Sequence, residues 1–193
     1  MDITPRQLEI IEAAGKLLTT SGVSGLTIKN LAKEMQFSES AIYRHFTSKE
    51  EIIVAMLNYL ADSIDKRLSD INDLSDPEEK FRALFKEQFR FFRLNPHFVV
   101  AVFSDGLMEE SQLINEAILK LMNVKTKHLM PIIIEGQQKG IFTNDITAEE
   151  LIHMVMGTFK LQMYKWRIAS FQFDISRIGG NMVQSILTII KSR

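Results

Sequence analysis

The sequence predicts an all-α protein of about nine helices, with a small N-terminal three-helix unit followed by a larger C-terminal helical bundle. Two observations favour this fold class. Hydrophobic residues recur with the period of a helix from end to end, whereas strict alternation over the length of a strand is hard to find. Residues that cap helix N-termini also precede most of these periodic segments. Helices are therefore expected throughout.

The first three helices have clear starting signals. Residues 4–7, Thr-Pro-Arg-Gln, combine an N-cap, a proline at the first helical position and a capping-box glutamine, which predicts a helix over about 5–20 before Gly22. Thr27 is expected to cap the second helix, and Ser38 the third. The third helix has room for only about two turns, because the next start signal follows within nine residues.

The fourth helix begins at a doubled signal. Residues 47–51, Thr-Ser-Lys-Glu-Glu, contain two overlapping capping boxes, one from Thr47 to Glu50 and one from Ser48 to Glu51. A hydrophobic stripe then continues to about residue 71, which is too long for a three-helix unit alone. This helix is expected to link the N-terminal unit to the rest of the chain.

The remaining helices form the second bundle. Residues 76–79 start a fifth helix that ends at 95–96, a short sixth runs through Phe103, and residues 104–106 break the chain. A long helix is expected over about 110–138, where Pro131 should introduce a kink. The last two helices start at the capping box of residues 147–150 and at Asp174.

Composition restricts the class of protein. The 193 residues include no cysteine, which excludes disulfides, a cysteine nucleophile and thiolate metal sites. No stretch reaches the length of a membrane span, so a cytoplasmic location without membrane contact is expected. The four histidines lack metal-ligand spacing, and no phosphate loop or nucleophile elbow is present. We therefore expect no metal, no cofactor, no catalytic residue and no enzyme.

The second and third helices have the spacing of a helix-turn-helix, in which the second helix enters the DNA major groove. Thr27 and Ser38 stand at helix N-termini, where hydroxyl and backbone N–H groups suit phosphate oxygens. Lys29, Arg44 and Lys49 supply positive charge at the edges. By position, the candidates for contact with base edges are Glu39, Ser40 and Arg44. The pattern alone leaves open a purely structural subdomain, with Tyr43 as an ordinary surface residue.

Two segments resemble the signature of the TetR (AcrR-type) transcriptional regulators. They are Leu-Thr-Ile-Lys-Asn-Leu-Ala at 26–32 and Ser-Ala-Ile-Tyr-Arg-His-Phe-Thr-Ser-Lys-Glu-Glu-Ile at 40–52. The resemblance covers about a quarter of the chain. It implies phosphate contacts by Thr27 and Lys29 in the second helix, and backbone contacts by Tyr43, His45 and Lys49. It also implies a C-terminal bundle that binds a small molecule between its helices.

Seven of the thirteen phenylalanines lie between residues 81 and 103, and cover more than one helix face. Any one of them is more simply explained as part of a packed core. Together with methionines on neighbouring helices, they also suit a tolerant ligand pocket. The candidate ligand-binding residues are Phe85, Phe89, Phe92, His97, Phe103, Met122, His153 and Gln162.

The last two helices carry a broad apolar face with small residues, Gly157, Gly179 and Gly180, which suggests close helix contact. One interpretation is a two-fold, four-helix interface, in accord with the way in which TetR-type proteins dimerise. The alternative is packing within one chain. The candidate dimer residues are Phe159, Met163, Trp166, Ile178, Met182 and Ile186.

These observations predict a ligand-responsive, homodimeric transcriptional repressor. Residues 1–50 would form the DNA-binding domain and residues 51–193 the ligand-binding and dimerisation domain. The expected partners are a palindromic double-stranded DNA operator and a small, largely apolar effector of unknown identity that releases it. Two alternatives stay open: a DNA-binding protein without small-molecule input, and a helical small-molecule carrier.

Overall fold

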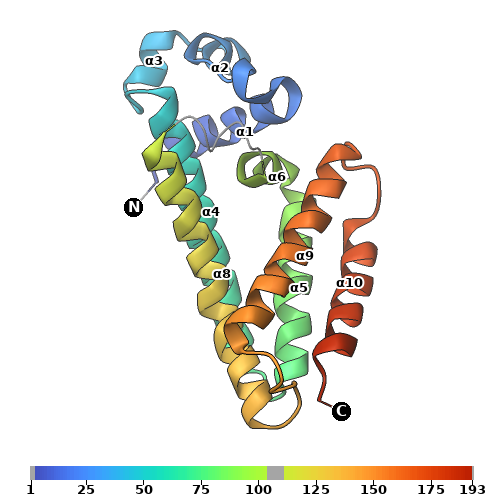
Figure 1. Cartoon of the computed structure of the whole chain (residues 1–193). Helices are drawn as coiled ribbons and strands as arrows, with labels where there is room; N and C mark the ends of the chain where they lie inside the picture. The colour runs from blue at the N-terminus through green and yellow to red at the C-terminus, as the bar shows by residue number, and fades with distance from the viewer. Residues whose placement is uncertain (1–2, 104–110, 193) are drawn as a thin grey trace. The chain divides into compact units, whose positions relative to one another are not determined.

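The computed structural model describes residues 3–103 and 111–192, and within these ranges it is all-α, as predicted (Figure 1). The predicted chain break at 104–106 lies outside the described residues. One isolated bridge joins Phe142 to Lys191, and no strand is formed in the described ranges. No helix in these ranges is long and apolar enough to cross a membrane. The chain divides into two compact units.

Unit 1 contains residues within Met1–Asp62 and Pro96–Met122. Its helices are α1 (Pro5–Gly25), α2 (Ile28–Met35), α3 (Glu39–Tyr43), the first part of α4 (Lys49–Ser69), α6 (Pro96–Phe103) and the first part of α8 (Gln112–Gln138). α1 packs against α2 and α6. Glycine at position 15 permits the latter contact, because a Cβ atom there would lie only 2.6 Å from Cδ2 of His97.

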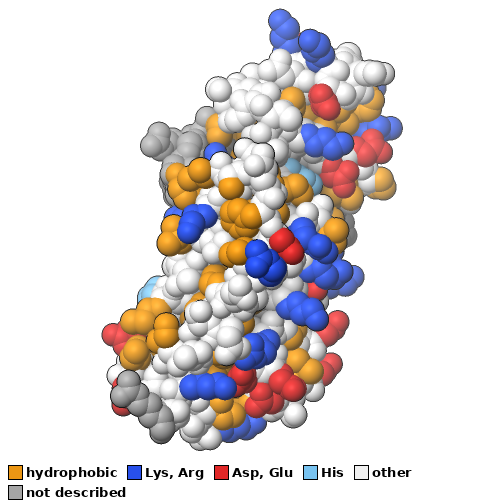
Figure 2. All heavy atoms as spheres, turned by 90° about the vertical axis from the view of Figure 1, so that its right-hand side faces the viewer, with side chains coloured by type: hydrophobic (Ala, Val, Ile, Leu, Met, Phe, Trp, Pro, Cys, Tyr) orange, Lys and Arg blue, Asp and Glu red, His pale blue; other side chains and the backbone are white. Residues whose placement is uncertain are grey.

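Unit 2 contains residues within Ser63–Asn95 and Asn123–Arg193. It holds the remainders of α4 and α8, a short 3-10 turn (Asp70–Asp73), α5 (Pro77–Leu94), α9 (Ala148–Ile168) and α10 (Ile175–Ile190). α5 packs chiefly against α10, and α9 packs against α10 as well. Over unit 2, Lys and Arg side chains gather toward the right of the face in Figure 2, and hydrophobic side chains gather toward its left.

The helix starts follow the capping signals of the sequence. The side chains of Thr4, Thr27, Ser38, Asp76, Thr147 and Asp174 each accept a hydrogen bond from a backbone N–H of the following turn. α1 continues through a non-helical residue at Gly22 (φ 66°) to Gly25, five residues beyond the expected end. The distortion falls where the sequence predicted a stop, since glycine adopts positive φ at little cost.

The start of α4 differs in detail from the expected pair of capping boxes. Ser48 accepts from the backbone N–H of Glu51 at 3.1 Å, as expected. However, the carboxylate of Glu51 accepts from the hydroxyl of Thr47 at 2.8 Å. Glu51 thus closes back onto Thr47, and no hydrogen bond joins Thr47 to Glu50 among the described residues. A single carboxylate completes the turn.

Candidate functional sites

The turn between α2 and α3 has the geometry of a helix-turn-helix. Thr27 Oγ1 accepts from the N–H of Asn30 at 3.1 Å, and Ser38 Oγ accepts from the N–H of Ala41 at 3.2 Å. Between the helices, Gln36 takes the left-handed conformation (φ 56°), and the N–H of Phe37 donates to the carbonyl of Ala32 at 2.8 Å. The connection is therefore tight, as a left-handed C-cap residue reverses the chain within three residues.

α1 holds this turn in place from behind. The guanidinium carbon of Arg6 lies 5.1 Å from the ring centre of Phe37, and Nε2 of Gln7 donates to the carbonyl of His45 at 3.3 Å. Ile42 and Phe46 bury their side chains in the unit 1 core. A five-residue helix is not stable alone, so α3 owes its order to these tertiary contacts.

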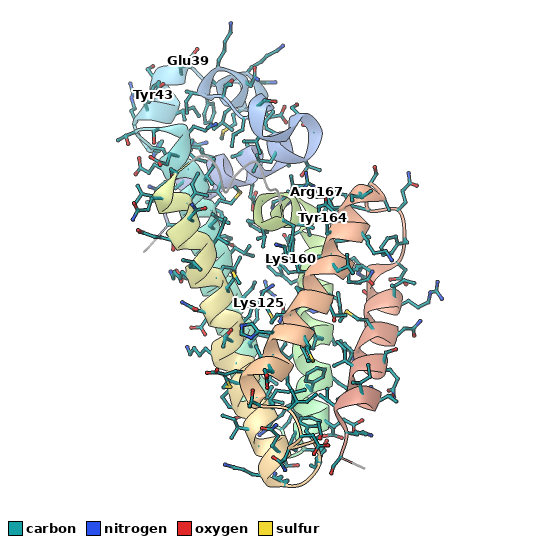
Figure 3. All side chains as sticks on the ribbon, in the orientation of Figure 1. Glu39, Tyr43, Lys125, Lys160, Tyr164 and Arg167 are labelled. Carbon is teal, nitrogen blue, oxygen red and sulfur yellow. The ribbon has the colours of Figure 1, made fainter. Side chains whose placement is uncertain are left out.

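The nine candidate DNA-binding side chains are all accessible. His45 and Lys49 are half-buried, and the other seven are exposed: Thr27, Lys29, Ser38, Glu39, Ser40, Tyr43 and Arg44. Tyr43 exposes 51% of its surface, a large fraction for an aromatic side chain. Figure 3 shows Glu39 and Tyr43 on the outer side of α3. The unit 1 core thus leaves all nine side chains at least partly exposed.

Unit 2 contains a buried aromatic cluster, formed by Phe85, Phe89, Phe92 and Phe159. The ring centre of Phe159 lies 5.7 Å from that of Phe85, 5.4 Å from that of Phe89 and 6.3 Å from that of Phe92. Phe85 and Phe89 lie 6.5 Å apart. Three of these four residues were predicted to bind a ligand, whereas Phe159 was predicted for the dimer interface. The structure places all four together.

A lysine lies against this cluster. Lys125 on α8 exposes only 3% of its surface, and its ammonium nitrogen lies 4.4 Å from the ring centre of Phe159 and 5.4 Å from that of Phe92. Burial lowers the pKa of Lys125 from 10.5 to about 7, because the charged form loses its hydration. The aromatic faces compensate part of that loss through cation–π attraction. The cluster therefore holds a group that changes charge near neutral pH.

Unit 2 also buries the amide of Gln88, which has no hydrogen-bond partner among the described residues. Gln88 lies on α5 and is 2% exposed. An unpaired buried amide costs about 1–3 kcal/mol, so such groups are rare unless they serve a function. Gln88 and Lys125 were both absent from the sequence prediction. The signal was available, since each occupies a position in the apolar stripe of its helix.

The other predicted ligand-binding residues are dispersed. His97, Phe103 and Met122 belong to unit 1, where the ring of His97 contacts that of Phe98 at a tilted angle and Met122 is exposed. Burial, followed by the charge of Lys16, lowers the pKa of His97, which keeps its imidazole neutral at pH 7. On α9, His153 is exposed and Gln162 is half-buried. Their role in ligand binding stays a prediction.

The predicted dimer residues are mostly covered within the protomer. Phe159, Met163, Trp166 and Ile186 are buried, and Ile178 and Met182 are half-buried. Trp166 donates its indole N–H to the carbonyl of Phe173 at 2.9 Å. These four belong to the core of unit 2, where Phe159 packs against phenylalanines of α5.

Another stripe on the same helices remains exposed. On α9, Met154, Leu161 and Ile168 recur every seven residues, with Tyr164 between the last two, and on α10 Ile189 is exposed. Leu161 exposes 58% and Ile168 66% of their surfaces. A heptad spacing of this kind forms a narrow apolar seam suited to another helix. The predicted role of the last two helices in dimerisation therefore has a candidate surface, displaced from the residues first proposed.

Comparison with known proteins identifies the class. Residues 10–56 match the model for bacterial regulatory proteins of the tetR family, and residues 56–189 match that for the C-terminal region of YsiA-like proteins. The "Fatty acid metabolism regulator protein" of Bacillus subtilis (strain 168) is 20% identical over 98% of this chain and 97% of its own length. The "Nucleoid occlusion factor SlmA" of Vibrio campbellii is 29% identical over 89% of this chain and 88% of its own.

The fold also resembles that of a known transcriptional regulator. A crystal structure of the transcriptional regulator FadR from Bacillus subtilis in complex with stearoyl-CoA superposes with a TM-score of 0.84, at 18% identity, over 95% of this chain and 98% of that one. The two family models together span residues 10–189, and the second alone matches more than half of the chain. The chain therefore belongs to the TetR family of bacterial transcriptional regulators.

Proposed function

We propose that this protein is a transcriptional repressor that responds to long-chain acyl-CoA and binds a palindromic operator as a homodimer in the cytoplasm. Residues 1–50 would contact DNA, and residues 51–193 would bind the effector and the second subunit. Two comparisons support the effector class: a relative named for fatty acid metabolism matches nearly the whole chain, and a similar fold holds stearoyl-CoA. In this chain, the observation that carries the proposal is Lys125 buried among aromatic rings.

The chemistry of the aromatic cluster fits an acyl thioester. Phenylalanine rings provide an apolar environment for an acyl chain, and their burial in unit 2 excludes water from it. A thioester carbonyl is a hydrogen-bond acceptor for the Lys125 ammonium group, and the amide of Gln88 can both donate and accept. Ligand binding could thus supply a partner for the buried Gln88 amide, which has none among the described residues. Because that gain exists only with ligand bound, it favours the liganded arrangement.

For the DNA-binding half, we propose two sets of contacts. Thr27, Lys29 and Ser38 would hold phosphates from the N-termini of α2 and α3, where free backbone N–H groups assist them. Tyr43, His45 and Lys49 would contact the backbone further along. The side chains that would then face base edges are Glu39, Ser40 and Arg44. Since four basic residues stand against two acidic ones between residues 27 and 49, affinity for random DNA should be modest.

The test starts with capture of fragments of the source genome by the purified protein. One enriched palindrome is expected, and a Tyr43→Ala, Lys49→Ala double variant should bind it at least about tenfold more weakly. Its salt dependence should be shallower, because the cationic phosphate contact of Lys49 is lost. Fluorescence anisotropy on a labelled operator measures both. Lys66→Ala, which removes an exposed lysine from the far end of α4, is the control and should bind as wild type does.

Effector action is then measured on the same operator. Stearoyl-CoA should weaken binding roughly 5- to 150-fold, the range of typical allosteric coupling. Free CoA and stearate are the comparison ligands. If the operator is bound equally well with and without stearoyl-CoA, the protein lacks this input and is a DNA-binding protein of another kind. If no DNA site is enriched at any salt concentration, the repressor proposal itself fails.

The proposed dimer predicts a change in mass. Glutamate in place of Leu161 and Ile168 would bring two charges into the apolar seam of α9, and burial of an unpaired carboxylate is costly. We therefore expect light scattering after gel filtration to give the 22.2 kDa of a single chain for this variant and twice that value for the wild type. Leu113→Glu with Leu119→Glu is the matched control, as both leucines are similarly exposed on α8. A dimeric Leu161, Ile168 variant would rule out this seam.

A further inference from the structure

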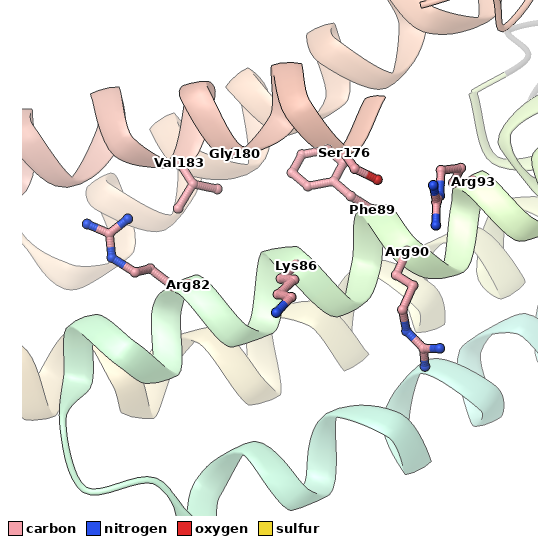
Figure 4. A pocket seen from close by; sticks show the side chains of 8 residues that line it. All are labelled: Arg82, Lys86, Phe89, Arg90, Arg93, Ser176, Gly180 and Val183. Atoms are coloured by element: carbon pink, nitrogen blue, oxygen red, sulfur yellow. The ribbon is translucent and has the colours of Figure 1, made fainter. Parts of the chain in front are cut away.

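A groove on the surface of unit 2 is not accounted for by DNA binding or by the apolar seam. It lies between α5 and α10 and has a volume of about 480 Å³, within the range of small-molecule sites (Figure 4). Four basic residues of α5 line it, together with Phe89 and three residues of α10: Ser176, Gly180 and Val183. The groove thus combines positive charge with an apolar floor.

The four cations of the groove share one face of α5. Arg82, Lys86, Arg90 and Arg93 follow each other at intervals of three or four residues, which places them in a row along the helix. Arg82 pairs with Glu78 at 2.7 Å, and Arg90 pairs with Glu87 at 2.8 Å. Hydrogen bonds from Lys191 and then from Arg82 lower the pKa of Glu78, and the hydrogen bond from Arg90 lowers that of Glu87. The two acids therefore remain charged beside Arg82 and Arg90, although Glu78 also pairs with Lys191 and Glu87 with Arg67.

The other two cations leave the groove positive. Lys86 and Arg93 are exposed, and neither forms an ion pair with another described residue. A row of exposed charges on a helix is often only a solvated face. Here, however, the row borders a hollow rather than a convex surface. The hollow exists in part because position 180 is glycine: a Cβ atom there would meet no atom within 4 Å.

One aromatic ring joins the groove to the interior. Phe89 lines the groove floor and is also part of the aromatic cluster, where its ring lies 5.4 Å from that of Phe159. Phe159 in turn lies 4.4 Å from the Lys125 ammonium nitrogen. Gly179 fixes this ring from α10, since a Cβ atom there would come within 2.4 Å of it. A molecule with an anionic end and an apolar chain would match the basic groove and the adjoining aromatic cluster.

We propose that the groove between α5 and α10 binds the phosphate groups of the effector, with Lys86 and Arg93 as the principal contacts. This inference rests on the proposed function, because it assigns the phosphate-bearing nucleotide end of an acyl-CoA to the groove. Phosphate suits the site, since lysine and arginine donors form charge-assisted hydrogen bonds with its oxygens. The apolar floor formed by Phe89 and Val183 would lie under the organic part of the same molecule.

Two kinds of variant test the groove in the full-length protein. Lys86→Gln with Arg93→Gln removes charge, and Gly180→Trp places a large side chain in the hollow from a position where a Cβ atom meets no other atom. Isothermal titration calorimetry should show stearoyl-CoA binding weakened tenfold or more by each, with operator binding unchanged in the absence of ligand. Lys66→Gln with Lys165→Gln changes the net charge equally outside the groove, and Gly180→Ala alters the helix without filling it. Both controls should bind as wild type does.

The ligands distinguish failure of this inference from failure of the proposed function. Free CoA should also bind the wild type and lose affinity in the groove variants, whereas stearate should be indifferent to them. If stearoyl-CoA binds all variants equally, the groove assignment is wrong and the acyl-CoA proposal stands. If free CoA binds through the groove but stearoyl-CoA leaves the operator complex intact, the phosphate site stands and the effector proposal falls. Absence of binding by either CoA compound overturns both.

Discussion

Replacement of Lys125 by methionine is expected to stabilise the protein by about 1–4 kcal/mol at pH 7 and to abolish its response to acyl-CoA. Lys125 is buried against Phe92 and Phe159, and exchange of a buried charge for an apolar side chain of similar length commonly has a stabilising effect of this size. The loss of response follows because methionine cannot donate a hydrogen bond to the ligand. Urea denaturation and operator release by stearoyl-CoA measure the two effects.

The stabilisation should depend on pH. The pKa of Lys125 is about 7 in the folded protein and about 10.4 in the unfolded chain, so below pH 7 both states are protonated and the full cost of burial applies. Between pH 7 and 10 the unfolded chain binds more protons, and the wild type gains up to about 1.4 kcal/mol per pH unit relative to the variant. The difference in free energy of unfolding between the Lys125→Met variant and the wild type should therefore decrease from pH 7 to pH 9.

Lys66→Met provides the control for both effects. Lys66 is exposed on α4, and its replacement should change the free energy of unfolding by less than about 0.5 kcal/mol at every pH. A stability gap between wild type and Lys125→Met that stays constant with pH would mean that Lys125 does not titrate in this range. If Lys125→Met still releases the operator when stearoyl-CoA is added, Lys125 is not part of the ligand site. The predicted effect of its burial on stability would not be affected by that result.

Truncation of Phe159 to alanine should have the opposite effect on stability, a loss of about 3–5 kcal/mol. Its ring is 1% exposed and contacts Phe85, Phe89 and Phe92, so alanine would leave a cavity in the centre of unit 2. The cation–π contact with Lys125 would be lost as well. The midpoint of urea denaturation measures this cost.

The same experiment separates a core role from the interface role first predicted for Phe159. A core residue lowers the denaturation midpoint by a similar amount at low and high protein concentration, whereas loss of an interface contact shifts the monomer–dimer equilibrium. Leu94→Ala is the control, because this leucine is exposed at the end of α5. A loss below about 1 kcal/mol, or a variant that is stable but monomeric, would contradict the core assignment.

Local signals explain why the helix starts were predictable. A hydroxyl or carboxylate at Thr27, Ser38 or Asp76 accepts a hydrogen bond from its own next turn, so the sequence contains both partners. The TetR assignment and the all-α fold are confirmed for similar reasons, since they depend on motifs and periodicity. Because TetR regulators are not enzymes, the expected absence of a catalytic role follows from the family.

Tertiary information explains what the sequence did not reveal. Periodicity shows that Phe159 lies on an apolar stripe, but it does not say whether α5 or a second subunit covers that stripe. A charged residue such as Lys125 is assigned to the surface by default, although its position between Leu121 and Leu129 is on the buried side of α8. Likewise, Met122 directly follows the buried Leu121, so it points to a different side of α8 and is exposed. In each case the sequence leaves open which neighbour covers a helix face.

The two adjacent glycines of α10 should tolerate substitution to different degrees. At position 179 a side chain would collide with Phe89, so selection for stability alone should exclude every other residue. At position 180 a side chain would meet no atom of its own protomer, and most residues form helix better than glycine does. Drift should therefore replace Gly180 readily unless something must enter that space. The variety of residues found there among descendants of this gene would record whether the cell uses the groove.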